Sequence, residues 1–285
     1  MNKSKIDWCD YTWNPVTGCY HGCSYCYAKR VAERFGKKFP DYSGYPIDHN
    51  GCHIIDSQFI DTPYPYIFEP TLHAYRLDEP IRKTKGAKIF VCSMADLFGE
   101  WVPDEWIEDV FKTVNKCPQH TFMFLTKNPR KYGFLNGKFY NYNCKWPENA
   151  CFGTTITKQE DAKRIRDLPY GSAKTFLSIE PMIGPVDLSF YLPKPTTRCK
   201  CSYCGHHADN YSSHCQHCGK NGGYSGSFRK QPINWVIIGA QTGPGAIPTK
   251  PEWVQSIIDQ CRAAGVPVFL KDNLNWPEKI QEYPW

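Results

Sequence analysis

The amino-acid sequence predicts an α/β protein built on a parallel sheet, in the form of an open or closed barrel of strand–helix units. Six short runs are rich in Val, Ile, Phe and Thr and nearly continuous in apolar residues, which is typical of strands buried on both faces. Helix-like stretches alternate with several of these runs. This alternation favours parallel strands joined by helical crossovers.

The predicted strands follow one another along the chain, at Lys88–Ser93, Thr121–Thr126, Ala150–Ile156, Lys174–Ile179, Asn234–Gly239 and Val266–Lys271. Three helices are expected between them, at Asp104–Asn115, Gln159–Leu168 and Pro251–Ala264. The last has a proline at its first position and Gly265 directly after its end, which are start and stop signals for a helix. A further helix begins near Ala28 and runs to Phe35, after an early strand.

Two segments interrupt this pattern. Phe39–Pro80 is rich in Pro, Tyr and Asp, and we expect a long excursion with some extended structure. Pro193–Gln231 is rich in Cys, His, Gly and Ser and holds almost no aliphatic residues, so it cannot form a hydrophobic core of its own. The expected organisation is therefore a barrel part over residues 1–192, an insert over 193–231 and the last barrel part over 232–285.

The composition excludes a disordered chain, because 41% of the 285 residues are hydrophobic and only 22% are charged. The N-terminus has no apolar stretch of the kind found in secretory signals, and no run reaches the roughly 18 apolar residues of a membrane span. We therefore expect a cytoplasmic protein without membrane contact. Its 15 cysteines then favour metal binding, since disulfides are rare in a reducing compartment.

The insert contains two Cys-x2-Cys pairs, each followed by glycine: Cys201 and Cys204, then Cys215 and Cys218. Four thiolates in two such pairs can close a tetrahedral Zn²⁺ site, and the metal would supply the folding energy that the insert lacks. The pattern predicts a structural zinc ribbon, with free surface thiols as the alternative. A histidine in place of one cysteine ligand stays open, because four histidines crowd the same segment: His206, His207, His214 and His217.

Near the N-terminus, Cys19, Cys23 and Cys26 have the spacing Cys-x3-Cys-x2-Cys within residues 18–27, which we name the cysteine loop. Three thiolates at this spacing can bind three irons of one [4Fe–4S] cluster and leave the fourth iron open. Gly18 and Gly22 allow the backbone to approach such a cluster closely.

This spacing, with an aromatic residue before the last cysteine, resembles the signature of the radical S-adenosylmethionine (SAM) superfamily. Further blocks resemble the phage-associated three-Cys-motif family of uncharacterised function: Trp13–Cys19, Phe90–Phe98, His120–Pro129, Phe176–Leu188, Trp235–Gly245 and Ala264–Lys271. The resemblance covers nearly the whole chain outside the two irregular segments. It implies a radical-SAM-type (β/α) barrel, partial or TIM-like, with the cluster and SAM at the carboxyl ends of the strands.

The resemblance also implies a reaction. Radical SAM enzymes reductively cleave SAM at the cluster to a 5′-deoxyadenosyl radical, which abstracts a substrate hydrogen atom. An electron donor of the flavodoxin or ferredoxin type is then implied. Cofactor-binding candidates carried over from the family pattern are Tyr25, Ser93, Asp96, Thr155, Glu180 and Gln241, and candidates for an anionic substrate are Lys127 and Lys271. The chain lacks the Gly-Gly-Glu segment that usually meets the SAM amino group, and Ser93–Asp96 stands in its place.

Simpler interpretations stay open for these residues. Asp96 and Glu180 are alternatively helix caps, and both lysines are alternatively solvated or paired. The cysteines outside the two clusters are expected to be small buried hydrophobic residues.

Basic residues flank the insert and populate the segment from Ala28 to Lys38, which favours a nucleic-acid or nucleotide substrate. The net charge of +6 is too small to demand one. The competing hypothesis is a non-catalytic iron–sulfur and zinc protein that binds nucleic acid or acts as an adaptor.

Overall fold

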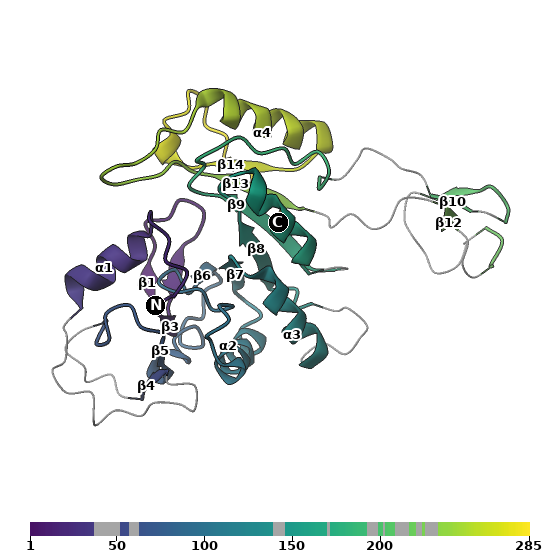
Figure 1. Ribbon diagram of the computed structural model, residues 1–285. Coiled ribbons are helices and arrows are strands. Elements are labelled where there is room, and N and C mark those ends of the chain that lie inside the picture. Colours follow the sequence, from purple (N-terminus) through teal and green to yellow (C-terminus); the bar gives the residue numbers. More distant parts are fainter. Residues whose placement is uncertain are drawn as a thin grey trace.

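The computed structural model describes residues 1–36, 52–56, 63–138, 146–169, 172–192, 199–201, 203–208, 217–220, 224–225 and 233–285. Its centre is an eight-stranded sheet in the order β1-β2-β6-β7-β8-β9-β13-β14 (Figure 1). The strands are β1 (Asn2–Lys3), β2 (Tyr11–Trp13), β6 (Lys88–Val91), β7 (Thr121–Thr126), β8 (Ala150–Thr155), β9 (Lys174–Ile179), β13 (Trp235–Ile238) and β14 (Val268–Leu270).

Every neighbouring pair in this sheet is parallel except β1 with β2. The predicted mixed α/β class with a largely parallel sheet is confirmed, and β7 and β9 have the predicted bounds. Within the described residues no hydrogen bonds join β14 to β1, so closure of a barrel stays a prediction.

Helices α2 (Asp104–Lys116), α3 (Tyr132–Lys138) and α4 (Pro251–Ala264) follow strands β6, β7 and β13 in the chain, and α1 (Tyr27–Phe35) follows the cysteine loop. Figure 1 shows α4 lying along β13 and β14. The apolar stripe of α2 is buried against the outer face of the sheet, which turns Ile89, Phe122 and Phe124 toward the main core.

One predicted helix differs. Residues Gln159–Asp167 form 3₁₀ turns (η3) instead of an α-helix. Only Ala162 and Ile165 of this segment are buried, so little apolar packing favours the wider α-helical winding. Three further 3₁₀ turns are η1 (Ala74–Arg76), η2 (Pro129–Lys131) and η4 (Asp272–Leu274).

The inner face of the sheet changes character along the strands. Near the amino ends it forms a second, separate core, which we name the floor: Trp8, Cys9, Phe90, Met123, Cys151, Phe176, Trp235, Ile237 and Phe269. Side chains on one face recur at every second residue, so two positions beyond Phe176 the same face carries Ser178 and then Glu180. Small and polar residues at these carboxyl ends leave space above the floor.

Two small sheets complete the fold. One pairs β3 (Val16–Thr17), β5 (Thr71–His73) and β4 (His53–Ile55), and it supplies the extended structure expected between Phe39 and Pro80. The other pairs β11 (His207–Ala208), β10 (Cys199–Cys201) and β12 (Tyr224–Ser225). It belongs to the expected insert, most of which lies outside the described residues, so its boundaries at 193 and 231 stay predictions.

No helix in the described ranges has both the length and the apolar character that crossing a bilayer requires.

Candidate functional site

A cavity of about 370 Å³ opens at the carboxyl ends of the parallel strands, above the floor. It brings together every candidate that the sequence placed outside the insert: Cys19, Cys23, Tyr25, Cys26, Ser93, Asp96, Lys127, Thr155, Glu180, Gln241 and Lys271. Strand-end residues of neighbouring parallel strands meet at one edge, which is why residues far apart in the sequence share this cavity.

The cysteine loop is fixed against the segment before β5. Gly18 has a φ of 88°, and a Cβ at this position would lie 2.1 Å from the carbonyl oxygen of Glu69. The Gly18 amide donates to the Met94 carbonyl over 2.9 Å, and the Cys19 amide donates to the Phe68 carbonyl over 3.1 Å. Only glycine fits such a close approach of two backbones.

Cys26 lies at the N-cap of α1, where its sulfur accepts a hydrogen bond from the Lys29 amide over 3.3 Å. The three thiols of the loop line the cavity, but among the described residues they do not form a group whose sulfurs all lie within 4.8 Å of one another. One metal ion needs such convergence, whereas a [4Fe–4S] cluster needs each thiolate at a different iron. The donor set fits a cluster better than a single ion.

A fourth cysteine, outside the Cys-x3-Cys-x2-Cys motif, also lines the cavity. Cys92 follows β6 directly, is only 3% exposed and has a φ of 56°. Burial raises the pKa of its thiol to about 12, and its sulfur accepts a backbone hydrogen bond from Val16. Cys92 is therefore a neutral thiol inside the site.

Asp96 joins the cysteine loop to two strand ends. Its carboxylate lies 2.7 Å from the His21 ring and accepts hydrogen bonds from the amides of Lys127 over 2.9 Å and Phe98 over 3.1 Å. Burial alone would raise the pKa of Asp96, but the hydrogen bond and charge of His21, with the Lys127 amide, hold it below its ordinary value. The bond from the Phe98 amide, two residues along the chain, is the local contact expected of a capping residue. The contacts with His21 and Lys127 join Asp96 to distant parts of the sequence as well.

Asn14 organises the end of β6. Its side-chain oxygen accepts from the Ser93 hydroxyl and from the Met94 amide, both over 3.1 Å. The Tyr27 hydroxyl donates to the Ser93 carbonyl over 2.6 Å. Asn14, His21 and Tyr27 are not among the site residues predicted from the sequence. Their positions in the sequence could have identified them, since Asn14 lies in the Trp13–Cys19 block and His21 and Tyr27 lie in the cysteine loop.

The wall opposite the loop carries an ion pair between Lys271 and Glu180, with the two side chains only 15% and 28% exposed. A Cβ on Gly239 would lie 2.9 Å from Glu180 and 3.0 Å from Lys271, so the absence of a side chain there makes room for the pair. Of the open alternatives, Lys271 is paired, and Glu180 bonds to the side chain that directly follows β14 rather than capping a helix.

Lys127 follows β7 and lies beside the loop. Its ammonium is 5.3 Å from the centre of the Tyr25 ring. Burial alone would lower the pKa of Lys127, but Tyr25, Cys23 and Asp96 raise it above its ordinary value. The side chain therefore stays charged in the cavity.

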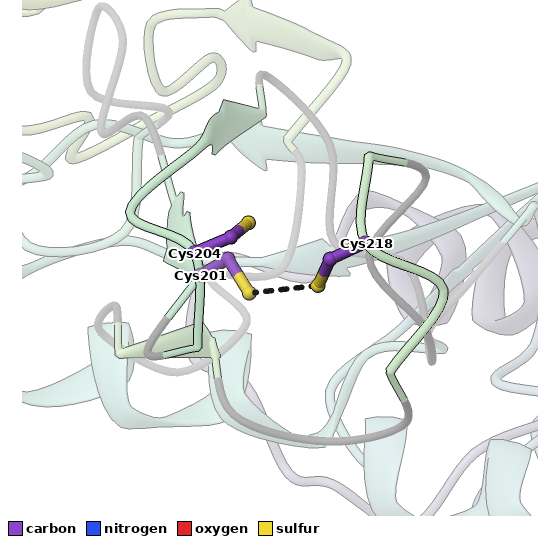
Figure 2. A group of neighbouring side chains, drawn as sticks. All are labelled: Cys201, Cys204 and Cys218. Carbon is purple, nitrogen blue, oxygen red and sulfur yellow. Dashed lines mark hydrogen bonds between the residues drawn. The ribbon is translucent and has the colours of Figure 1, made fainter.

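In the insert, the sulfurs of Cys201, Cys204 and Cys218 all lie within 4.8 Å of one another. Figure 2 shows Cys201 and Cys218 pointing toward one another, with their sulfurs 3.8 Å apart. Zinc–sulfur bonds of about 2.3 Å in a tetrahedron place two sulfurs about 3.8 Å apart. The three thiols can therefore hold one ion. Cys215 and His214 lie outside the described residues.

The remaining cysteines that the structure describes are buried, as expected for small hydrophobic residues: Cys9, Cys52, Cys92, Cys117, Cys151 and Cys261. Cys144 and the side chain of Cys199 lie outside the described part of the chain.

Comparison with solved structures finds spore photoproduct lyase complexed with dinucleoside spore photoproduct, at 12% identity and a TM-score of 0.41 over 63% of this chain. A cysteine-to-alanine mutant of that lyase, also with dinucleoside spore photoproduct, matches at 13% identity and a TM-score of 0.39 over 63% of this chain. The chain spans 48% and 47% of those structures, about half their length. Likeness at this level is too weak to establish a shared fold or activity.

A search of curated proteins finds no match. A sequence profile, by contrast, matches residues 3–282, nearly the whole chain. Its description names no function, so the resemblance to a phage-associated family stays a prediction. By this match the protein belongs to the family described as protein of unknown function (DUF5131).

Proposed function

We propose that the protein is a radical SAM enzyme. The observation that carries the proposal is the cavity itself, which gathers three cysteines at Cys-x3-Cys-x2-Cys spacing and the polar ends of the parallel strands. Cys19, Cys23 and Cys26 would hold a [4Fe–4S] cluster, and their spread in space suits one better than a single ion. When bound, the cluster supplies the electron that cleaves SAM to a 5′-deoxyadenosyl radical.

In this proposal, the residues of the chain bind SAM and orient it. Ser93 and Asp96 present polar atoms where members of the superfamily use Gly-Gly-Glu, and Tyr25 offers a ring within the cysteine loop. On the far wall, Glu180 has an acceptor for amine or ribose hydroxyl groups. Thr155 and Gln241 line the space between these two walls.

The floor keeps water from the reacting groups. The Trp8 ring lies 4.8 Å from Phe90 and 6.5 Å from Trp235, so the amino ends of the strands are closed by aromatic packing. Exclusion of water protects reactive species in an active site.

The proposed substrate is a nucleic acid or nucleotide. Arg30 of α1 donates to the carbonyl of Thr242, a residue that lines the cavity, over 3.4 Å. Tyr27, which lines the cavity, keeps 46% of its surface exposed. Cationic and aromatic groups at one opening suit the phosphates and bases of a single strand. The electron donor would be of the flavodoxin or ferredoxin type.

The insert is proposed to be a zinc ribbon over residues 193–231, with Cys201, Cys204, Cys215 and Cys218 as ligands. Gly205 and Gly219 both have a φ of 70°, so the backbone turns in the same way after each Cys-x2-Cys pair. A site closed by four protein ligands has no open position, so the metal there would stabilise the fold without catalysis.

The test is anaerobic reconstitution with iron and sulfide, followed by dithionite and SAM. The expected product is 5′-deoxyadenosine, and Cys23→Ala should abolish both the cluster and the product. An intact cluster that forms no 5′-deoxyadenosine would reject the proposed radical SAM activity.

Cys92 gives the competing function its specific support, because a fourth cavity thiol could close the cluster and leave no iron for SAM. The variant Cys92→Ala separates the two hypotheses. An enzyme with three cysteine ligands keeps its iron content and absorption spectrum in this variant. Loss of the cluster in Cys92→Ala, but not in the matched core variant Cys261→Ala, would favour a non-catalytic nucleic-acid-binding or adaptor protein.

A further inference from the structure

The excess positive charge of the chain lies mostly in the insert. Residues 193–231 hold six of the 34 Lys and Arg residues but only one of the 28 Asp and Glu residues. The insert therefore carries five of the six excess charges, and the rest of the chain is close to neutral. Four thiolates around one Zn²⁺ together carry about two negative charges, so the insert stays positive with its proposed metal bound. Such a local excess of charge indicates an anionic partner.

Four exposed side chains connect the two Cys-x2-Cys segments of the insert. The first segment offers Tyr203 and His206, and the second offers His217 and Lys220 at the same two positions relative to its cysteines. The Lys220 ammonium lies 4.9 Å from the centre of the Tyr203 ring. The His206 and His217 rings are stacked, with their centres 4.7 Å apart and their planes at 9°. Each pair therefore takes one residue from each segment.

The backbone that carries the thiols also carries these exposed pairs. The Cys201 amide donates to the His206 carbonyl over 2.9 Å, and the Gly205 amide donates to the Cys201 carbonyl over 2.8 Å. The sulfurs of Cys201 and Cys218 lie 3.8 Å apart, so the two segments meet at the thiols as well. A metal ion held by these thiols would therefore fix the spacing of the two exposed pairs.

The exposure of the rings indicates which kind of anion the insert binds. Tyr203 keeps 57% of its surface exposed, with an ammonium beside its ring. A ring in this position does not stabilise a core, but it offers a flat face to a base, and the ammonium offers a donor to a phosphate. The exposed His206–His217 pair offers a second flat surface. An anionic lipid surface would use the charge but has no planar group for the rings.

We propose that the insert binds single-stranded nucleic acid, with Tyr203 and the His206–His217 pair as stacking surfaces for bases and Lys220 as a contact for phosphate. This inference rests on the proposed nucleic-acid substrate but not on the cleavage of SAM. It gives the insert a role beyond the stability that a closed zinc site provides.

The test is fluorescence anisotropy of the full-length, zinc-loaded protein with labelled single-stranded DNA and RNA of the same mixed sequence, in the absence of SAM. The two strands distinguish DNA from RNA as the partner. Loss of a base-stacking ring weakens binding by about 5- to 100-fold, so Tyr203→Ala should raise the Kd by that factor and Tyr203→Phe should not. Lys220→Gln should raise the Kd and reduce the slope of log Kd against log salt concentration by about 0.7.

A matched control lies outside the insert, where the Lys88 ammonium is 3.6 Å from the centre of the exposed Tyr283 ring. Tyr283→Ala and Lys88→Gln should leave the Kd and its salt dependence at the wild-type values. Zinc analysis shows whether each variant keeps its metal. If Tyr203→Ala loses zinc, the comparison of Lys220→Gln with Lys88→Gln decides.

Unchanged affinity in both Tyr203→Ala and Lys220→Gln, with full zinc content, would overturn the inference. Equal losses in Tyr203→Ala and Tyr203→Phe would overturn it too, because the ring could not then be the contact. Binding to phosphatidylserine vesicles but to neither strand would overturn it and assign the charge to a membrane surface. A wild type that binds neither strand would reject the proposed nucleic-acid substrate as well. Failure to form 5′-deoxyadenosine, with insert-dependent binding intact, would reject the radical SAM activity and leave this inference in place.

Discussion

At the scale of single residues, the site depends on glycines as much as on its polar side chains. Gly18 and Gly239 each leave room for a close neighbour: a backbone carbonyl in one case and the Glu180–Lys271 pair in the other. Sequence reasoning found Gly18 because it stands beside a cysteine. It could not foresee the ion pair, since Glu180 and Lys271 are 91 positions apart and only the folded sheet makes them neighbours.

Gly18 and Gly22 provide a matched pair for mutation, because both have positive φ, at 88° and 66°. Alanine at either position adds left-handed backbone strain of roughly 1–2 kcal/mol. At Gly18 the new Cβ also meets the Glu69 carbonyl at 2.1 Å, whereas at Gly22 nothing lies within 4 Å. Gly18→Ala should therefore lose bound iron and melt at a lower temperature than Gly22→Ala. Equal iron content and equal melting temperatures would contradict this account of the loop.

His73 makes stability depend on pH. It is 1% exposed, its ring lies 2.9 Å from the Thr17 hydroxyl, and burial lowers its pKa well below the ordinary value. The unfolded chain takes up a proton near pH 6.5 and the folded chain does not, so stability is fully present above that pH and is lost as the pH falls below it. In urea titrations between pH 7.5 and 5, His73→Gln should show a shallower loss of unfolding free energy than the wild type. Parallel slopes would show that another group controls the acid sensitivity.

At the scale of elements, strands β6, β7, β8, β9, β13 and β14 were predictable because they are buried on both faces and their sequences are continuous apolar runs. The sheet of β3, β4 and β5 was not, since it consists of two- and three-residue strands fixed by distant partners such as Thr17 and His73. The 3₁₀ turns of η3 were not predictable either. Their sequence also suits an α-helix, and only the shortage of buried contacts favours 3₁₀ turns over an α-helix.

The contact of β8 with β9 in the floor yields a further prediction. Gly153 pairs with Phe176, and a Cβ on Gly153 would lie 2.4 Å from the Phe176 ring. Gly153→Ala should lower the free energy of unfolding by about 1–3 kcal/mol, as overpacked cores do. The double variant with Phe176→Leu should recover part of the loss in a chemical denaturation series. Additive losses would mean that the ring is free to move aside.

The insert should respond to metal removal independently of the cavity. Cys204→Ala removes one of three converging thiols, so bound zinc should fall while iron content stays at the wild-type level. Metal analysis of the purified protein measures both at once. Loss of iron together with zinc would show that the two sites depend on each other.

At the scale of the whole molecule, the position of the candidate site was predictable from one rule, that the carboxyl ends of parallel strands meet. Every strand-end candidate lines the one cavity for this reason. The polar framework behind them was not predictable. Asn14 contacts Ser93 after β6, and Asp96 joins His21 of the cysteine loop to Lys127 after β7; no spacing in the sequence encodes such pairs.

The floor joins the two ends of the chain. Trp8 meets Trp235, Trp235 meets Trp285, and the Asp272 amide donates to Asp7 over 3.0 Å. Strands β13 and β14 supply Trp235, Ile237 and Phe269, so a chain without these strands has an incomplete floor beneath the cysteine loop. We therefore expect stable insertion of iron to require β13 and β14. Truncation after residue 232 should give a chain that retains its cysteine motif yet exposes those thiols to oxidation.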